Sequence, residues 1–290
     1  MKRVGFGGIQ IRRVSEKQAI EVVRRCYELG VDYCDTARAY TASEERIGKA
    51  LEDMRDEFFL ARAREVSLKN LRTDWIDVYQ LHNVSSREVW ERVKAPDGAL
   101  EALYEAKDAG KIMHLGLTSH SQSVLTEIVK GNIETVMIPY NFLTIQPEEE
   151  LLPLCHQMDV GTIIMKPLGG GAFTNANTAL KYVLGNKDID VVIPGMMTVK
   201  EVEENVAIGA DTYEFSSEEF KLLQNDKKEL GSQFCRTCHY CQPCPPEIPI
   251  SFALRVESFN KWRGLTPSLE QRFIETKAKV ETCLKCGECE

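Results

Sequence analysis

The stretch "VDYCDTARAY" (residues 31–40) begins as an apolar run and ends in a polar loop. The run stops at Asp35, and Tyr40 follows five residues later with an arginine two positions before it. Such a run, opening apolar and closing on a carboxylate, is typical of a buried strand that emerges at the edge of a sheet. The role of Asp35 and Tyr40 therefore depends on which residues the other strands place at the same edge of the sheet.

Short apolar runs alternate with amphipathic helical patterns from residue 4 to about residue 230. Eight of these runs read as strands, at 4–9, 31–36, 58–61, 76–82, 114–119, 135–141, 161–166 and 191–195. Eight strands alternating with helices predict an α/β fold, a (β/α)8 TIM barrel with a parallel sheet. An open doubly wound sheet is the alternative, but no GxGxxG follows the first strand.

Polar residues stand at the C-terminal ends of five different predicted strands. They are Asp35, His82, Ser119, Asn141 and Lys166. In a barrel these ends converge on one rim, where barrel enzymes place their catalytic residues. Any one of them alone is more commonly a hydrogen-bonding group at a strand end. Five on one rim favour a functional site.

The composition is that of an ordinary soluble protein. Of the 290 residues, 28% are charged and 43% hydrophobic, and the formal net charge is −8. This acidic balance argues against nucleic acid or an anionic membrane as the main partner. No run approaches the roughly 20 apolar residues of a membrane span, and the N-terminus lacks the apolar core of a signal peptide. A cytoplasmic location is expected.

Several segments resemble the aldo/keto reductase family. The segments that carry the resemblance are "GFGG", "ELGVDYCDTARAYTASEERIGKAL", "SLKNLRTDWIDVYQLHNV", "GKIMHLGLTSH", "PYNFL", "MKPLGGG" and "IPGMMTVKEVEENV", in the family's order. The resemblance implies a nicotinamide-dependent oxidoreductase that interconverts a small-molecule carbonyl and an alcohol, with an Asp, Tyr, Lys, His tetrad. Asp35, Tyr40 and His82 match three of its members. Tyr40 would then protonate the carbonyl oxygen while His82 orients the carbonyl.

The tetrad lysine is missing from its usual place at the end of the third strand. That region reads Arg62, Ala63, Arg64, so either arginine, or less directly Lys166 on the seventh strand, is expected to supply the positive charge beside Tyr40. The third and fourth strands are also joined by an unusually short segment. The alternative function is a binding or electron-transfer subunit that keeps the barrel and cofactor pocket without turnover.

The resemblance also implies a cofactor site for NAD(P)(H). The residues matched to it are Gly8, Ser119, His120, Met165, Lys166, Pro167, Leu168, Gly169, Gly170, Gly195, Met196, Glu204 and Asn205. Gly195 carries no charge where a basic residue is usual, and Glu201 stands where the family often has an arginine. Both features favour NAD(H) over NADP(H), because a glutamate that points inward repels a 2′-phosphate.

The ten cysteines are unevenly distributed. Cys26, Cys34 and Cys155 lie in apolar segments and are expected to be inert core thiols. The other seven form two triplets at steps of three, with one further cysteine, and they are Cys235, Cys238, Cys241, Cys244, Cys283, Cys286 and Cys289. This spacing, with Pro after Cys244, favours [4Fe–4S] ligation, and a structural zinc site is the alternative.

The tail resembles a ferredoxin-like extension found in a subgroup of the family. In that arrangement Cys283, Cys286 and Cys289 join Cys244 in one complete cluster. The first triplet needs an eighth cysteine that the sequence does not contain, so one or two clusters are expected. We therefore expect a barrel at residues 1–230 and a small helical iron–sulfur extension at 231–290. The extension would relay electrons, with a redox partner protein, or stabilise the structure.

Overall fold

The computed structural model describes residues 3–63, 67–84, 86–210, 213–230, 234–235, 241–256, 260, 266–287 and 289. Within these ranges, the side chains at 39, 62, 63 and 67 are outside the description.

Eight parallel strands form one sheet in the order β1 to β8. They are β1 (Phe6–Gly7), β2 (Tyr33–Ala37), β3 (Phe59–Ala63), β4 (Ile76–Leu81), β5 (Ile112–Thr118), β6 (Thr135–Pro139), β7 (Gly161–Met165) and β8 (Val191–Val192). Bridges from Val4 to Val192 and from Gly7 to Gly195 join the first and last strands. The sheet therefore curls into a near-closed barrel, and the predicted (β/α)8 architecture is confirmed.

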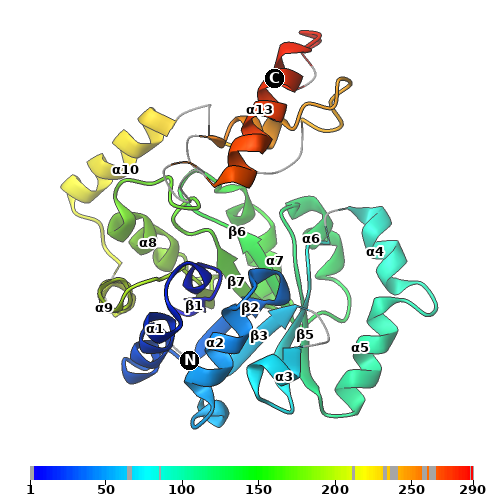
Figure 1. The fold of residues 1–290 in the computed structure, drawn as a ribbon, viewed down its shortest axis with the longest axis vertical. Helices are drawn as coiled ribbons and strands as arrows, with labels where there is room; N and C mark the ends of the chain where they lie inside the picture. Colours follow the sequence, from blue (N-terminus) through cyan, green and yellow to red (C-terminus); the bar gives the residue numbers. More distant parts are fainter. Residues whose placement is uncertain are drawn as a thin grey trace.

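Helices surround the strands (Figure 1). The helices that follow β1 to β8 are α1 (Glu16–Glu28), α2 (Ser43–Leu51), α3 (Ser67–Leu71), α4 (Arg87–Lys94), α5 (Ala99–Asp108), α6 (Gln122–Ile128), α7 (Leu151–Gln157), α8 (Ala176–Gly185) and α9 (Val199–Gly209). Short 3-10 turns are η1 (Gln10–Arg13), η2 (Arg38–Tyr40), η3 (Arg55–Glu57) and η4 (Gln146–Glu148). The five-residue α3 bears out the short connection between β3 and β4.

Helix α1 shows why these segments fold as they do. Ser15 caps it by accepting a hydrogen bond from the N–H of Gln18. Ala19, Val22 and Cys26 repeat at helical spacing and are fully buried, so one stripe of the helix packs on the barrel. The opposite face carries charged side chains. The periodicity in the sequence thus fixes which side of α1 faces the sheet.

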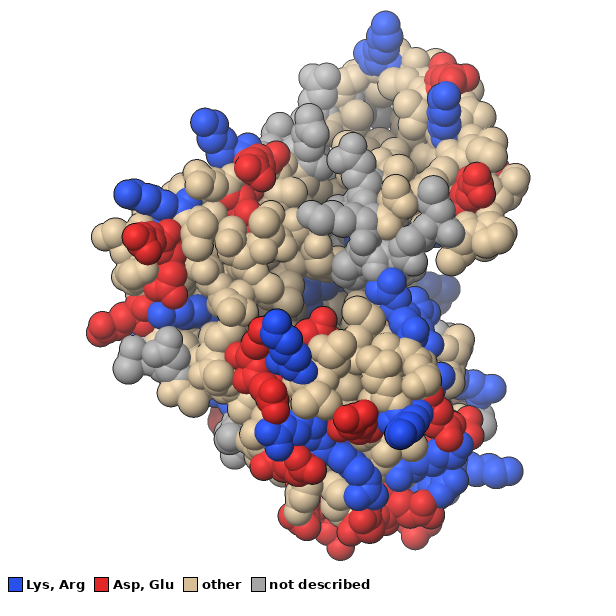
Figure 2. Space-filling model, turned by 60° about the vertical axis from the view of Figure 1, so that its left-hand side comes forward, with Lys and Arg blue, Asp and Glu red and all other residues tan. Residues whose placement is uncertain are grey.

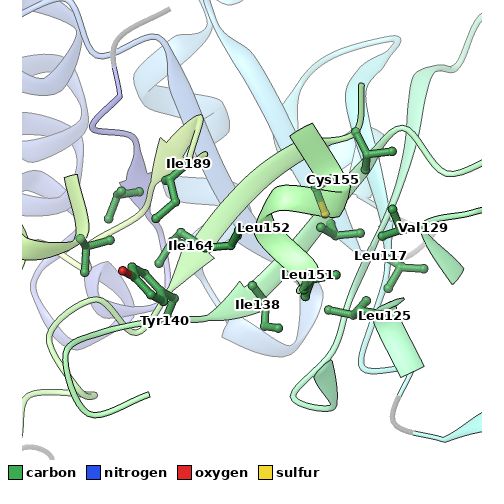
Figure 3. Packing of buried hydrophobic residues seen from close by; sticks show 14 of the residues in the cluster. Leu117, Leu125, Val129, Ile138, Tyr140, Leu151, Leu152, Cys155, Ile164 and Ile189 are labelled. Carbon is green, nitrogen blue, oxygen red and sulfur yellow. The ribbon is translucent and has the colours of Figure 1, made fainter. Parts of the chain in front are cut away.

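The main core lies between the sheet and its outer helices. Leu151, Leu152 and Cys155 of α7 pack in one cluster with Leu117 of β5 and Ile138 of β6 (Figure 3). Burying each leucine contributes about 1.5–3 kcal/mol to the free energy of unfolding.

None of the described helices is long and apolar enough to cross a membrane.

The chain after α10 (Ser217–Leu230) is called the C-terminal extension, and its described helices lie over one end of the barrel (Figure 1). Its described helices are α11 (Ile250–Ala253) and α13 (Pro267–Glu281). Phe252 of α11 packs on Phe273 of α13 at 5.5 Å, and Arg272 stacks over the Phe252 ring at 4.1 Å.

On the face in Figure 2, blue and red side chains are interspersed over the barrel, so no single charge dominates it.

Candidate active site

Asp35 lies inside the barrel near the C-terminal end of β2. In the register of the sheet it stands between Gly7 of β1 and Ala61 of β3, and its exposed fraction is 8%. Burial raises the pKa of its carboxyl group to about 8. None of the described side chains donates a hydrogen bond to it. In this environment the carboxyl group is largely protonated at neutral pH.

Tyr40 follows Asp35 through the η2 turn and is half-buried. Burial raises the pKa of its phenol, the nearby Asp35 raises it further, and Arg12 on η1 opposes the shift. Arg12 is therefore a cation at Tyr40 that sequence reasoning missed. Its only signal in the sequence was a position just after the first strand. Of the cations expected there, Arg62 lies in β3 with its side chain undescribed, and Arg64 lies outside the described residues.

His82 directly follows β4 and is exposed at the rim. The next residue, Asn83, has a left-handed backbone with φ of 54°. This conformation is uncommon outside glycine and is tolerated by asparagine. The turn leaves His82 toward the same end of the barrel as Asp35, because His82 follows β4 and Asp35 lies in the C-terminal part of the parallel strand β2.

Ser119 and His120 follow β5 and differ in their surroundings. The Ser119 hydroxyl is fully buried, donates to the Val84 carbonyl at 2.7 Å and accepts from the Ser121 N–H at 2.9 Å. His120 is half-exposed, and its Nε2 lies 2.7 Å from Nζ of Lys166. The Ser119 hydroxyl therefore holds the backbone of the rim in place. The His120 ring extends across the rim to Lys166.

Lys166 follows β7 with a left-handed backbone, φ 56°. The Asn141 side chain donates to its carbonyl at 3.1 Å, which anchors this conformation from the end of β6. Burial lowers the pKa of the Lys166 ammonium to about 8, Arg255 of the C-terminal extension lowers it further, and Cys235 opposes the shift. Residues of the extension are thus close enough to the barrel rim to alter its electrostatics.

The segment after Lys166 forms a tight glycine turn. Pro167 is buried, Leu168 is partly buried against the core, and Gly169, Gly170 and Gly171 have φ of 58°, 70° and 87°. Only glycine adopts three such conformations in a row without strain. Met165, just before, packs against the residues that fill the barrel interior.

The remaining predicted cofactor residues gather where β1 and β8 meet. Gly8 is buried, and a Cβ there would lie 2.6 Å from the Asp35 carbonyl oxygen. Gly195 is exposed, while the Met196 side chain is fully buried in the core. On α9, Asn205 is buried and Glu204 is exposed, with one of its oxygens 3.6 Å from Lys200.

The Glu201 carboxylate is engaged in hydrogen bonds at the start of α9. It accepts hydrogen bonds from the N–H groups of Met197 at 2.6 Å and Thr198 at 3.0 Å, and it completes a capping box with Thr198. The carboxylate is used to start α9. The expected repulsion of a 2′-phosphate by Glu201 therefore loses its basis.

The cysteines fall into two environments. Cys26, Cys34 and Cys155 are fully buried, as expected, and burial raises the pKa of each thiol. In the tail, Cys235, Cys241 and Cys244 are partly buried, Cys283, Cys286 and Cys289 are exposed, and Cys238 lies outside the described residues. Among the residues that the structure describes, no three His, Cys, Asp or Glu side chains are grouped to hold a metal ion.

The two cysteine motifs are nevertheless parts of one packed unit. Lys279 near the end of α13 donates to the Glu247 carbonyl at 3.3 Å, and Glu247 lies three residues after Cys244. Cys235 contacts α11, with Sγ 3.4 Å from Oγ of Ser251.

Comparison with known proteins agrees with the barrel fold. The family model described as "Aldo/keto reductase family" matches residues 3–179. The chain belongs to the aldo/keto reductase family. Among its aldo/keto reductase relatives, the Bacillus subtilis protein described as "Uncharacterized oxidoreductase YqkF" is 27% identical, over 79% of this chain and 94% of its own.

Solved aldo/keto reductase structures show the same fold. The holo form of AKR11C1 from Bacillus halodurans superposes with a TM-score of 0.66 at 25% identity, covering 77% of this chain and 91% of its own. An aldo-keto reductase from Klebsiella pneumoniae, solved in complex with NADPH, has a TM-score of 0.66 at 21% identity, covering 77% of this chain and 90% of its own. Both matches leave part of the present chain uncovered.

Proposed function

We propose that this aldo/keto reductase interconverts a small-molecule carbonyl and an alcohol with a nicotinamide dinucleotide. The observation that carries the proposal is the pair of Asp35 and Tyr40 at the end of β2. Both are at least half-buried, close enough for Asp35 to shift the pKa of Tyr40, and on the rim that also carries His82. A buried acid beside a phenol at the C-terminal rim is suited to moving a proton.

The residues of the rim also fit the dinucleotide. The left-handed turn at Gly169–Gly171 lets the backbone approach a phosphate group closely, and Lys166 places a cation next to it. The Klebsiella structure, which has a similar fold and was solved in complex with NADPH, supports a dinucleotide as the ligand. We assign Gly8, Ser119, His120, Met165, Gly195 and Asn205 to the same site as part of the proposal. The bound cofactor would supply the hydride for the carbonyl carbon.

The chain's own residues would handle the proton and the substrate. Tyr40 holds a proton on its phenol oxygen through neutral pH because burial disfavours tyrosinate, and Asp35 disfavours it further once its own carboxyl group ionises at higher pH. In the reductive direction that proton passes to the carbonyl oxygen, and Arg12 stabilises the charge left on the phenol. His82 orients the carbonyl by a hydrogen bond from its exposed ring.

We also propose that residues 1–230 form the barrel and that 231–290 form an iron–sulfur extension. The support is the chemistry of the donors: thiols at two-residue gaps, with Pro after Cys244, are the set that [4Fe–4S] clusters use. Among the residues that the structure describes, the tail cysteines are not gathered around one position. Iron and acid-labile sulfide in anaerobically purified protein would support the proposal. Stoichiometric zinc without sulfide would contradict it.

The experiment that tests the reaction is a carbonyl panel with the full chain. Anaerobically purified protein is mixed with NADPH or NADH and aldehydes, ketones and 2-oxo acids, and the loss of absorbance of the reduced nicotinamide is followed. We expect turnover that depends on the carbonyl compound. Tight dinucleotide binding without turnover on any compound would favour the non-catalytic subunit instead.

A further inference from the structure

Arg255 of the C-terminal extension reaches the glycine turn of the barrel. Its Nη2 lies 4.0 Å from the position that a Cβ on Gly170 would occupy. Its charge also lowers the pKa of the Lys166 ammonium. The extension thus places a guanidinium group over the turn that ends β7, at the mouth of the barrel.

The glycine turn is held firmly between the barrel and the extension. A Cβ on Gly169 would lie 2.7 Å from the Phe173 ring, so the turn packs directly on that ring. Phe173 in turn packs on Phe142 at 4.2 Å and on Phe234 of the extension at 5.9 Å. Asp226 of α10 accepts hydrogen bonds from the next backbone N–H groups of the loop, at Thr174 and Asn175.

The hydrogen bonds within the turn use two of the three glycine N–H groups. The N–H of Gly169 donates to the Lys166 carbonyl at 3.0 Å, and that of Gly171 donates to Leu168 at 2.9 Å. Across the parts of the chain that the structure describes, no acceptor is assigned to the N–H of Gly170. A backbone N–H in a left-handed turn is suited to binding an anion, and the Arg255 guanidinium group near Gly170 favours negative charge there.

We propose that Arg255 binds the phosphates of the dinucleotide together with the Gly170 N–H and Lys166. The inference rests on the proposed function and adds to it that the cysteine-rich extension is part of the cofactor site. A guanidinium group matches phosphate oxygens through two parallel hydrogen bonds, which an ammonium group cannot do.

Electrostatics supports this role. Arg255 and Lys166 are both partly buried, and each is less stable as a cation because of burial. Their like charges also repel, as the effect of Arg255 on Lys166 shows. A phosphate bound between Arg255 and Lys166 would offset their repulsion. It would also replace the hydration that both cations lose on burial. The extension would thereby contribute to affinity for the dinucleotide, whatever its redox role.

A second arginine provides a matched control. Arg255 and Arg272 line the same pocket of the extension, which has a volume of about 450 Å³. Arg272 instead stacks on Phe252. Substituting either arginine removes one positive charge from the extension, but only Arg255 is near the glycine turn.

The test uses calorimetry to measure the equilibrium binding of NADPH, NADH and adenosine to the anaerobically purified full chain. Arg255→Gln is expected to raise the Kd of both dinucleotides about tenfold, the loss expected for a hydrogen bond to a charged group. Adenosine, which has no phosphate, should bind equally to both proteins. Arg272→Gln should change each Kd less than about twofold. Arg255→Lys keeps the charge and the fold and should lie between wild type and Arg255→Gln.

The outcomes separate the two proposals. Equal Kd values for wild type and Arg255→Gln, or equal losses for Arg255→Gln and Arg272→Gln, would overturn the role of Arg255 and leave the reductase function standing. A wild-type protein that binds neither dinucleotide would overturn both. Circular dichroism shows whether Arg255→Gln folds. If it does not, the Kd of Arg255→Lys tests the role of Arg255 instead. A wild-type Kd for Arg255→Lys would contradict bidentate binding of the phosphates.

Discussion

Nζ of Lys166 lies 2.7 Å from Nε2 of His120, and Nδ1 of the same ring lies 3.4 Å from the side-chain oxygen of Asn83. The three residues follow β7, β5 and β4, so this chain of polar groups spans the mouth of the barrel. A partly buried ammonium group is costly unless its N–H groups have acceptors. The contact with His120 therefore stabilises Lys166 where a cofactor would need it.

A double-mutant cycle on this pair should show coupling. His120→Leu and Lys166→Met each remove one partner, and the double variant removes both. We expect a coupling energy of about 1 kcal/mol in the free energy of unfolding by urea, because the contact is partly buried. The exposed pair Lys200 and Glu204 is the control and should couple by less than about 0.5 kcal/mol. Equal coupling in the two pairs would contradict a structural role for the rim contact.

Asp35→Asn should stabilise the protein at alkaline pH and lower its activity. The folded-state pKa of about 8 lies above the usual carboxyl value of 3.8, so the contribution of Asp35 to stability falls as pH rises from about 4 to about 8. The variant lacks that loss and should exceed wild type by about 5 kcal/mol at pH 8.5. At pH 4 the two should be equal. Denaturation curves at both pH values measure this, and a pH-independent difference would refute a raised pKa.

The contribution of Glu134 to stability changes with pH in the opposite direction to that of Asp35. Burial alone would raise its pKa, but hydrogen bonds from Lys107 and His114, both at 2.6 Å, outweigh burial and lower it to about 2. The resulting stability is complete above the usual glutamate pKa of 4.5 and is lost as pH falls toward 2. Glu134→Gln should thus be less stable than wild type at pH 7, with the gap narrowing below about pH 4.5.

The control for this pH dependence is Glu127→Gln, which removes an exposed partner of Arg87. Its effect on the free energy of unfolding should be small at every pH. A gap for Glu134→Gln that stays constant from pH 7 to pH 3 would rule out the lowered pKa.

Glu201 is expected to affect stability and not cofactor choice. Its carboxylate caps α9, so Glu201→Gln should weaken one charged cap and cost about 0.5–1 kcal/mol of unfolding free energy. The ratio of NADPH to NADH affinity should stay within about twofold of wild type. A large shift in that ratio toward NADPH would restore Glu201 as a residue that excludes the 2′-phosphate.

The barrel was predictable because its signals are local. Apolar runs of strand length and the Ser15 cap of α1 each reflect neighbouring residues, and all eight strands occur where the runs predicted them. The terminal strands are shorter than expected. Gln10–Arg13 turns into a 3-10 helix after β1, and Pro194 lacks the N–H needed to extend β8.

The site was predictable only in part, because some of its contacts join distant segments. Asp35 and Tyr40 share one short stretch, so their proximity followed from the sequence. Arg12 and Arg255 come to the rim through the closure of the barrel and the packing of the extension. No spacing along the chain links Arg255 to Gly170, and the capping role of Glu201 depends on where α9 begins.

The most direct test of the account is the turnover of Tyr40→Phe. The substitution removes only the phenol oxygen, and Tyr104→Phe on the exposed face of α5 is the matched control. If Tyr40 donates the proton, carbonyl reduction should fall at least about 100-fold in Tyr40→Phe, while NADPH binding, measured separately, stays within about twofold. Tyr104→Phe should match wild type in both. A Tyr40→Phe protein that binds the dinucleotide and reduces carbonyls as fast as wild type would contradict the assignment of Tyr40 and the mechanism built on it.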